Sequence, residues 1–207
     1  MADIMTMKTT TLESKPMKKI LLAAALIGTA ATSAFAAPEK YTLDSSHSQI
    51  LFNYNHLGFS TTYGMFSGFE GEIMFDQEDP ANSSVTVSMP ANSMLTGWEA
   101  RFNHFMSDDF FGATDEEMVT FTSTGIEVTG DDTALITGDL TLNGVTKSVV
   151  LDAKLNQAGE HPMAKKPWAG FDATTTLVRS EYELGQFAPY VSDEVEVHIS
   201  VEAMKAE

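Results

Sequence analysis

Apolar and polar residues alternate along most of the chain beyond residue 37, a pattern typical of β-strands with one buried face. At 194–202 a valine or isoleucine occupies every second position, with Glu, His and Ser between them. The segments 134–142 and 148–155 alternate in the same way and are separated by Asn143-Gly144, a pair that favours a two-residue hairpin turn. Further strands are predicted at 40–44, 48–57, 65–76, 83–89, 117–128 and 168–178.

Eight or nine strands of this kind predict an all-β protein. An antiparallel up-and-down β-barrel of about eight strands is the expected fold because closure removes exposed strand edges, and a two-sheet sandwich is the alternative. The interior of a barrel of this size is either filled by side chains or holds one elongated ligand. The alternation does not distinguish these two cases.

The segment after Thr96 departs from the period of two. Trp98, Phe102, Phe105 and Met106 recur at helical spacing, and threonine is a residue type that caps the start of helices. We therefore predict one short amphipathic helix inserted between strands. Its apolar face must pack against another element, and the open end of a barrel is the surface available to it.

The first 36 residues have the features of a bacterial export signal. Lysines precede an apolar run at 20–27, and Ala34-Phe35-Ala36 matches the small-x-small pattern of a signal-peptidase site. We expect cleavage after Ala36, which leaves a single domain over 37–207. The signal is complete from Met17 onward, so the residues before Met17 are interpreted as an upstream extension, and translation starts at Met1 or Met17. The run is too short for the ~20 residues of a membrane-spanning helix, so an integral membrane protein is not expected.

Charge and composition exclude several classes of function. Cleavage would leave eight Lys and Arg against 27 Asp and Glu, a net charge of −19. Such a charge repels phosphate groups, which disfavours nucleic-acid binding and electrostatic attraction to anionic lipids. The chain has no cysteine, which excludes disulfides, a thiol nucleophile and a lipidated cysteine. The oligomeric state is left open, with a homodimer as one alternative.

An enzyme is the rival class, and His104 with Asp108 and Asp109 provides its best material because a carboxylate can orient an imidazole as a general base. The sequence lacks a Gly-x-Ser-x-Gly elbow and a glycine-rich phosphate loop. The five histidines lack the spacing of a metal motif, although His47 and His56 could meet across strands. We therefore expect no catalysis, no metal and no cofactor.

Five segments that span nearly all of the chain beyond residue 37 resemble, in order, the signatures of the YceI family. They are 41–76, 101–111, 119–124, 136–151 and 178–203. Among them, Gly138-Asp139-Leu140-Thr141-Leu142-Asn143-Gly144-Val145-Thr146-Lys147 is the most distinctive. The resemblance implies a lipocalin-like barrel exported to the periplasm, whose relatives bind polyisoprenoids, isoprenoid quinones or other long-chain amphiphiles inside the barrel.

Strand alternation and this resemblance together identify candidate ligand-binding residues. They are Phe52, Tyr54, Phe66, Phe69, Trp98, Phe102, Phe105, Phe110, Phe111, Phe121, Phe171 and Arg179. The phenylalanines of 101–111 are expected to close or line the tunnel. Arg179 either anchors a ligand headgroup or pairs with Glu181 or Glu183. The expected function is a carrier for a long apolar molecule, and the alternative is a filled barrel that acts as a stress-related interaction protein.

Overall fold

The computed structural model describes residues 37–112 and 117–207, which belong to one compact unit. The predicted signal peptide lies outside the described residues. The strands are β1 (Glu39–Leu43), β2 (Gln49–His56), β3 (Ser60–Phe66), β4 (Glu70–Phe75), β5 (Ser84–Pro90), β6 (Met94–Leu95), β7 (Met118–Val128), β8 (Thr133–Leu142), β9 (Val145–Glu160), β10 (Pro167–Val178) and β11 (Glu194–Lys205). The helices are α1 (Glu99–Phe105) and three 3-10 turns, η1 (Pro80–Asn82), η2 (Ala91–Ser93) and η3 (Arg179–Tyr182).

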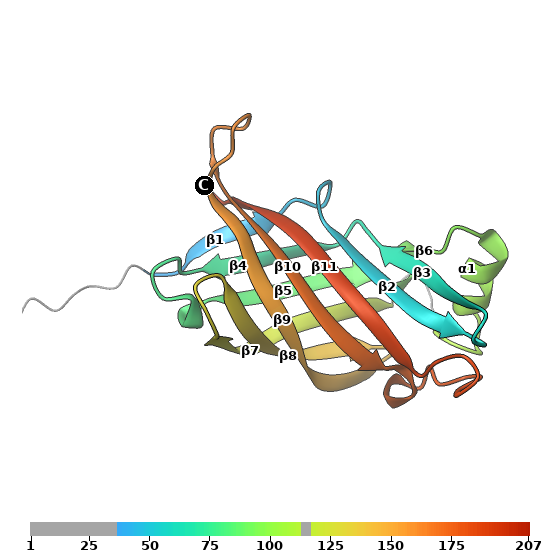
Figure 1. Ribbon diagram of the computed structural model, residues 1–207. Helices are drawn as coiled ribbons and strands as arrows, with labels where there is room; N and C mark the ends of the chain where they lie inside the picture. Colours follow the sequence, from blue (N-terminus) through green and yellow to red (C-terminus); the bar gives the residue numbers. More distant parts are fainter. Residues whose placement is uncertain (1–36, 113–116) are drawn as a thin grey trace, which may run out of the picture. The chain divides into compact units, whose positions relative to one another are not determined.

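The strands form a closed antiparallel barrel in the order β1-β4-β5-β7-β8-β9-β10-β11-β2-β3-β6, with β11 also paired with β1 (Figure 1). The ring closes where β11 pairs with β1, at Leu43↔Ala203 and the two pairs beside it. The same edge of β11 also pairs with β2. The consecutive strands β1 and β2 thus act together as one interrupted strand, as do β3 and β4, and β5 and β6. With these three counted as single strands, the sheet has the eight strands of an up-and-down barrel. The predicted fold is confirmed.

Several strand boundaries differ from the sequence prediction. The strand predicted at 65–76 is two strands, β3 and β4, because Gly68 adopts a positive φ of 70° that ends the first. β3 begins at Ser60 and forms a tight hairpin with β2, whose turn contains Leu57 and Gly58 at φ values of 58° and 76°. The Asn143-Gly144 hairpin is confirmed, with both residues at positive φ and Leu142 paired with Val145.

The predicted helix is present, but its first residue and its cap differ from the prediction. Trp98, not Thr96, is the N-cap of α1, and no side chain caps the helix. The Thr96 hydroxyl instead donates to the Trp98 carbonyl at 2.9 Å, within the loop that leads into the helix. Figure 1 shows α1 at one end of the barrel, opposite the end that carries the 161–166 turn. Within the described residues, no helix has the length and hydropathy to cross a membrane.

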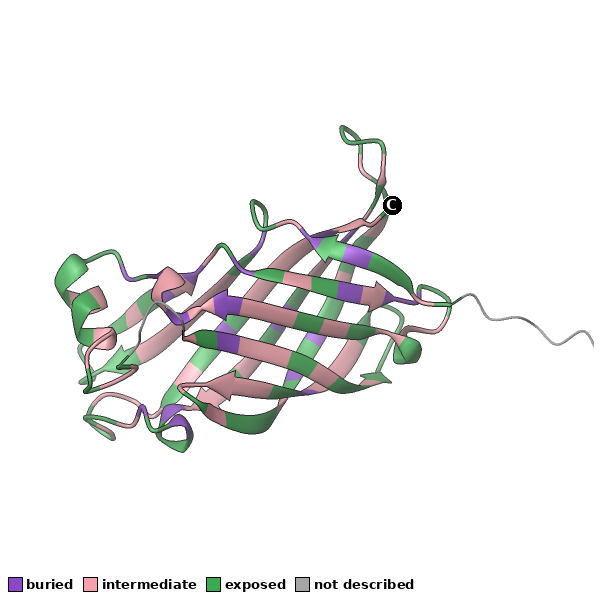
Figure 2. Cartoon of the chain, turned by 180° about the vertical axis from the view of Figure 1, so that it is seen from behind, coloured by how far each residue is buried: buried purple, intermediate pink, exposed green. Residues whose placement is uncertain are grey.

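Inward side chains of the barrel divide into two packed groups. The larger group joins β1, β3, β4 and β5 and contains Phe69, Met94 and Phe75, among others. The smaller group lies across the barrel on β9 and β10 and consists of Leu151, Ala153 and Ala173. Many other inward residues are only partly buried, which gives the banded colouring of the strands in Figure 2. In a filled barrel these inward side chains would be fully buried, so the barrel is hollow between the two packed groups.

Candidate functional site

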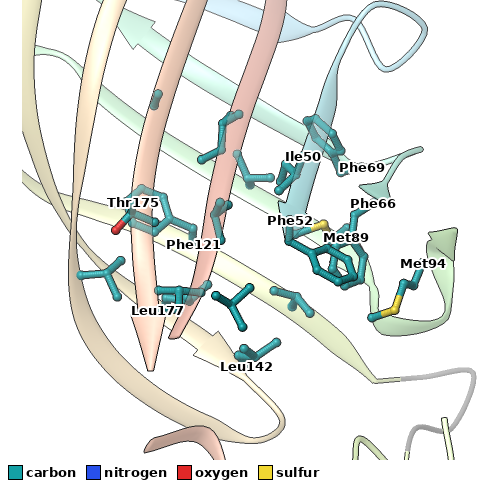
Figure 3. Close-up of a pocket in the computed structure, with 18 of the residues that line it drawn as sticks. Ile50, Phe52, Phe66, Phe69, Met89, Met94, Phe121, Leu142, Thr175 and Leu177 are labelled. Carbon is teal, nitrogen blue, oxygen red and sulfur yellow. The ribbon is translucent and has the colours of Figure 1, made fainter. Parts of the chain in front are cut away.

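An apolar cavity of about 800 Å³ occupies the barrel interior, within the range of ~300–1,000 Å³ that is typical of small-molecule sites. Alternate residues of β2, β5, β8, β9, β10 and β11 line it. Figure 3 shows Phe52, Phe66 and Met89 on one side, with Phe121 and Thr175 across from them. Aliphatic lining residues include Ile50, Ile73, Val85, Val87, Ile136, Leu140, Leu142, Val149, Leu151, Leu177, Val195, Val197, Ile199 and Val201.

Two glycines of the barrel wall make room for aromatic rings that line the cavity. The Phe52 ring lies over Gly64 of the neighbouring strand, where an added Cβ would come within 2.1 Å of the ring. The Phe121 ring covers Gly138 in the same way, at 2.3 Å. Each ring therefore occupies the space that a side chain at the glycine would fill.

All the residues predicted from the sequence except Phe102 line the cavity. Phe102 packs against the larger core group instead, because its position on α1 turns it toward the barrel wall. Phe66, at the end of β3, and Phe69, just before β4, are buried, whereas Phe52, Phe121 and Phe171 are partly buried. A ligand contact at each of these residues stays a prediction.

Aromatic rings from three segments meet at the barrel end that carries α1. The ring centroids of Phe105 and Phe110 are 5.4 Å apart, and those of Tyr54 and Phe105 are 6.2 Å apart. Phe187, in the loop before β11, lies 6.2 Å from Phe110 and 6.1 Å from the His104 ring. These contacts form an aromatic cluster of cavity-lining residues at this end of the barrel.

Arg179 is a buried structural residue that also lines the cavity. Its guanidinium donates to the backbone carbonyls of Ser192 at 2.8 Å, Val191 at 2.9 Å, Gln186 at 2.8 Å and Leu184. The described structure shows no ion pair between it and Glu181 or Glu183, so that predicted alternative is wrong. Burial lowers the pKa of Arg179, and the nearby Asp193 opposes this shift.

Three further polar lining residues lie near the same mouth. His56 ends β2, and Arg101 and His104 lie on α1. Arg101 donates to the Thr96 carbonyl at 3.0 Å. The acidic lining residue Asp172 lies on β10, several residues from Arg179. The cavity thus has an apolar body and a mouth that offers hydrogen-bond donors to the polar end of an amphiphile.

The best enzyme candidate is only partly assembled. The His104 Nε2 atom lies 3.4 Å from the Asp109 Oδ2 atom, so the predicted imidazole–carboxylate pair forms with Asp109. The Ser107 hydroxyl donates to the His104 backbone carbonyl, not to its ring. Both side chains of the pair are about half exposed, which is unlike the buried setting of an oriented general base.

A second polar cluster lies outside the cavity and joins Asp44, His47 and Glu202. One ligand-type atom of each residue lies within 4.8 Å of the others. His47 Nδ1 is 2.8 Å from Asp44 Oδ2, and Trp168 donates to Glu202 at 2.9 Å. Hydrogen bonds from Ser46 and His47 lower the pKa of Asp44, and Asp44 raises the pKa of His47. His47 is therefore paired with Asp44, while His56 lies at the far end of β2.

Sequence reasoning missed two parts of the site. It named aromatic residues and Arg179 and left out the many aliphatic residues of the lining, although the alternation already placed Val195, Val197 and Ile199 on one face. It also missed Phe187, which lies in a loop with no periodicity. The run 184–191, LGQFAPYV, has no charged residue in an otherwise acidic chain, and that was the available signal.

Comparison with known proteins gives consistent matches over this barrel. The YceI-like domain family matches residues 41–203. A UPF0312 protein of Ectopseudomonas mendocina is 38% identical over 195 residues, which cover 91% of this chain and 100% of that protein. Protein YceI of Escherichia coli is 39% identical over 191 residues, covering 91% of this chain and 99% of that one.

Solved structures match the same fold. The Campylobacter jejuni YCEI protein superposes with a TM-score of 0.67 at 30% identity, covering 74% of this chain and 90% of that one. Burkholderia cenocepacia BcnA gives 0.70 at 22% identity, covering 77% and 98%. A polyisoprenoid binding domain from Saccharophagus degradans gives 0.62 at 15% identity, covering 80% and 98%. From its eight-stranded barrel and from these matches, the chain belongs to the YceI-like domain family.

Proposed function

We propose that this protein is a binding or carrier protein that holds a long apolar ligand, such as a polyisoprenoid, an isoprenoid quinone or a similar lipid, inside the barrel. The observation that carries the proposal is the apolar cavity of about 800 Å³. At about 0.8 kcal/mol per buried CH₂ group, ten buried groups would contribute roughly 8 kcal/mol. This gain corresponds to a dissociation constant of the order of micromolar before the costs of association.

The mouth supports an amphiphile with its polar end outward. Arg101, His56 and His104 supply donors there, while the apolar tail would extend past Phe52 and Phe121 toward the far end of the lumen. Arg179 already donates to four backbone carbonyls, which leaves it one guanidinium hydrogen for a headgroup. Its main role in the proposal is to fix the loop that carries Phe187.

Two alternatives have less support. A filled-core interaction protein has no need of a cavity this large. A hydrolase that uses His104 would need a nucleophile, and the nearby Ser107 hydroxyl is bonded to the backbone. The similarity to a polyisoprenoid binding domain from Saccharophagus degradans is in keeping with a binding role that involves no catalysis.

Export to the periplasm completes the proposal. It is supported by the export-signal features of residues 1–36. Expression of the full chain, followed by cell fractionation and N-terminal sequencing, would give a periplasmic protein that begins at Ala37. A cytoplasmic protein that retains Met17 would contradict it.

The carrier role is tested by extracting the purified protein with organic solvent and identifying co-purifying lipid by mass spectrometry, with the intact native mass measured alongside. We expect a stoichiometric prenyl or quinone species. Ala153→Phe places a ring inside the lumen and should reduce both the bound lipid and the binding of N-phenyl-1-naphthylamine, an apolar fluorescent probe. Val150→Phe is the matched control because Val150 is exposed on the outer face of the same strand. Equal loss in both variants, or a protein that binds neither lipid nor probe, would contradict the proposal.

A further inference from the structure

Large apolar side chains are exposed around the mouth of the cavity, where three segments meet. We call this set the mouth rim: Leu57, Phe59, Tyr63, Trp98, Phe187 and Tyr190. Phe59 is 91% exposed, Tyr190 78% and Trp98 64%. Among the described residues, the other exposed large apolar side chains are Leu95 on β6, Met118 and Val128 on β7, Val150 on β9 and Met163 in the 161–166 turn.

Backbone contacts fix the mouth rim as one surface. The Leu57 amide donates to the Tyr190 carbonyl at 3.1 Å, which joins the β2–β3 turn to the loop before β11. Phe187 of that loop contacts the His104 ring of α1. Figure 1 shows α1, the β2–β3 turn and this loop at the same end of the barrel.

Charge is absent from the segments that carry most of the mouth rim. About 20% of the residues in the chain are charged, yet 57–69, 80–98 and 184–192 contain no Asp, Glu, Lys or Arg. Acidic residues border these segments, among them Glu99 and Glu183. A surface with an uncharged centre and an acidic border matches an electrically neutral apolar phase and repels an anionic one.

We propose that the mouth rim docks onto the neutral lipid of a bilayer surface, with the cavity mouth facing the membrane. Trp and Tyr favour the level of the lipid headgroups because each has an apolar body and a polar tip. An apolar ligand could then pass from bilayer to barrel without crossing water. The biological role of this docking rests on the proposed carrier function, although the docking itself needs no bound ligand.

The two tryptophans allow the orientation to be measured. Trp98 lies in the mouth rim, and Trp168 starts β10 at the opposite end of the barrel, where it donates to Glu202. In the Trp168→Phe protein only Trp98 emits, and in the Trp98→Phe protein only Trp168 emits. With phosphatidylcholine vesicles that contain brominated acyl chains, we expect blue-shifted, quenched emission from Trp98 and unchanged emission from Trp168.

Rim variants outside the cavity lining test the contact directly. Phe59→Ser with Tyr190→Ser should weaken sedimentation with phosphatidylcholine vesicles by roughly tenfold or more, because two exposed aromatic rings lose their apolar burial. Met163→Ser removes a residue that is 86% exposed at the other end and should bind as the unmodified protein does. Adding phosphatidylglycerol should weaken binding through repulsion of the acidic border.

Three results would overturn the proposal: equal quenching of both tryptophans, no quenching of either, or a protein dimer that the Phe59→Ser, Tyr190→Ser variant dissociates. The last result would assign the mouth rim to a second copy of the chain. Failure of the carrier function can be told apart from failure of docking, because Ala153→Phe should reduce probe binding and leave the quenching of Trp98 unchanged. A protein that docks but binds no probe would refute the carrier function alone.

Discussion

Replacing Arg179 by lysine should loosen the loop that closes the mouth while keeping the positive charge. The guanidinium makes four hydrogen bonds to carbonyls between Leu184 and Ser192, and a lysine ammonium can replace about one of them. A hydrogen bond to a charged group contributes about 1.5–3 kcal/mol. About three hydrogen bonds would be lost, and at the low end of this range they contribute roughly 4.5 kcal/mol. Carbonyls near the surface can form hydrogen bonds to water instead, which reduces the expected loss of stability to about 3 kcal/mol.

This loss should lower Tm by roughly 6–12 °C for a domain of this size, as measured by circular dichroism. Hydrogen–deuterium exchange should rise most over residues 180–193. Arg101→Lys is the matched control, since Arg101 makes one side-chain hydrogen bond, to Thr96, and should cost less than about 1 kcal/mol. An Arg179→Lys protein whose Tm and loop exchange equal those of the Arg101→Lys protein would refute this account of Arg179.

Two further predictions concern the lumen and the cluster outside it. Gly64→Ala should destabilise the protein by about 1–3 kcal/mol because the new Cβ displaces the Phe52 ring, whereas Gly159→Ala, with open space around it, should leave Tm nearly unchanged; equal Tm values would contradict the close packing. Asp44→Asn should lower the pKa of His47, read from its imidazole protons by NMR. Because the pKa of His47 is raised, its pairing stabilises the fold below about pH 6.5, and because the pKa of Asp44 is lowered, its pairing stabilises the fold above about pH 4. The loss of stability caused by Asp44→Asn should therefore be largest between these two pH values and decline outside them.

The alternation of apolar and polar residues was sufficient to predict the barrel, because every strand of a closed barrel has one face toward the apolar interior. It failed where the backbone turns without polar turn residues. The β2–β3 turn contains Leu57 and Phe59, and the break between β3 and β4 depends on the positive φ of Gly68. Leu57 and Phe59 are large apolar residues, so the composition of this turn gives no polar signal that the chain reverses there.

The candidate site was only partly predictable, for a physical reason. Alternation places Phe52 and Phe121 inside the barrel, but whether the barrel is filled or hollow depends on how each ring lies. The position of each ring depends in turn on a glycine of the neighbouring strand, Gly64 for Phe52 and Gly138 for Phe121, and each glycine comes next to its ring only when the strands pair. The role of Arg179 was likewise hidden, because its partners are backbone carbonyls that no side-chain pattern reveals.

The short strand β6 determines how the segment before α1 is attached to the barrel wall. β6 pairs with β3, and in the described part of the chain it has no ladder to β7, whose pairing with β5 ends at Pro90↔Met118. Within the described residues, β6 is therefore held to the barrel wall by its two pairs with β3, Met65↔Leu95 and Phe66↔Met94. Local opening of this segment would break only these two pairs, so it should cost less free energy than opening one of the long ladders between β8, β9, β10 and β11.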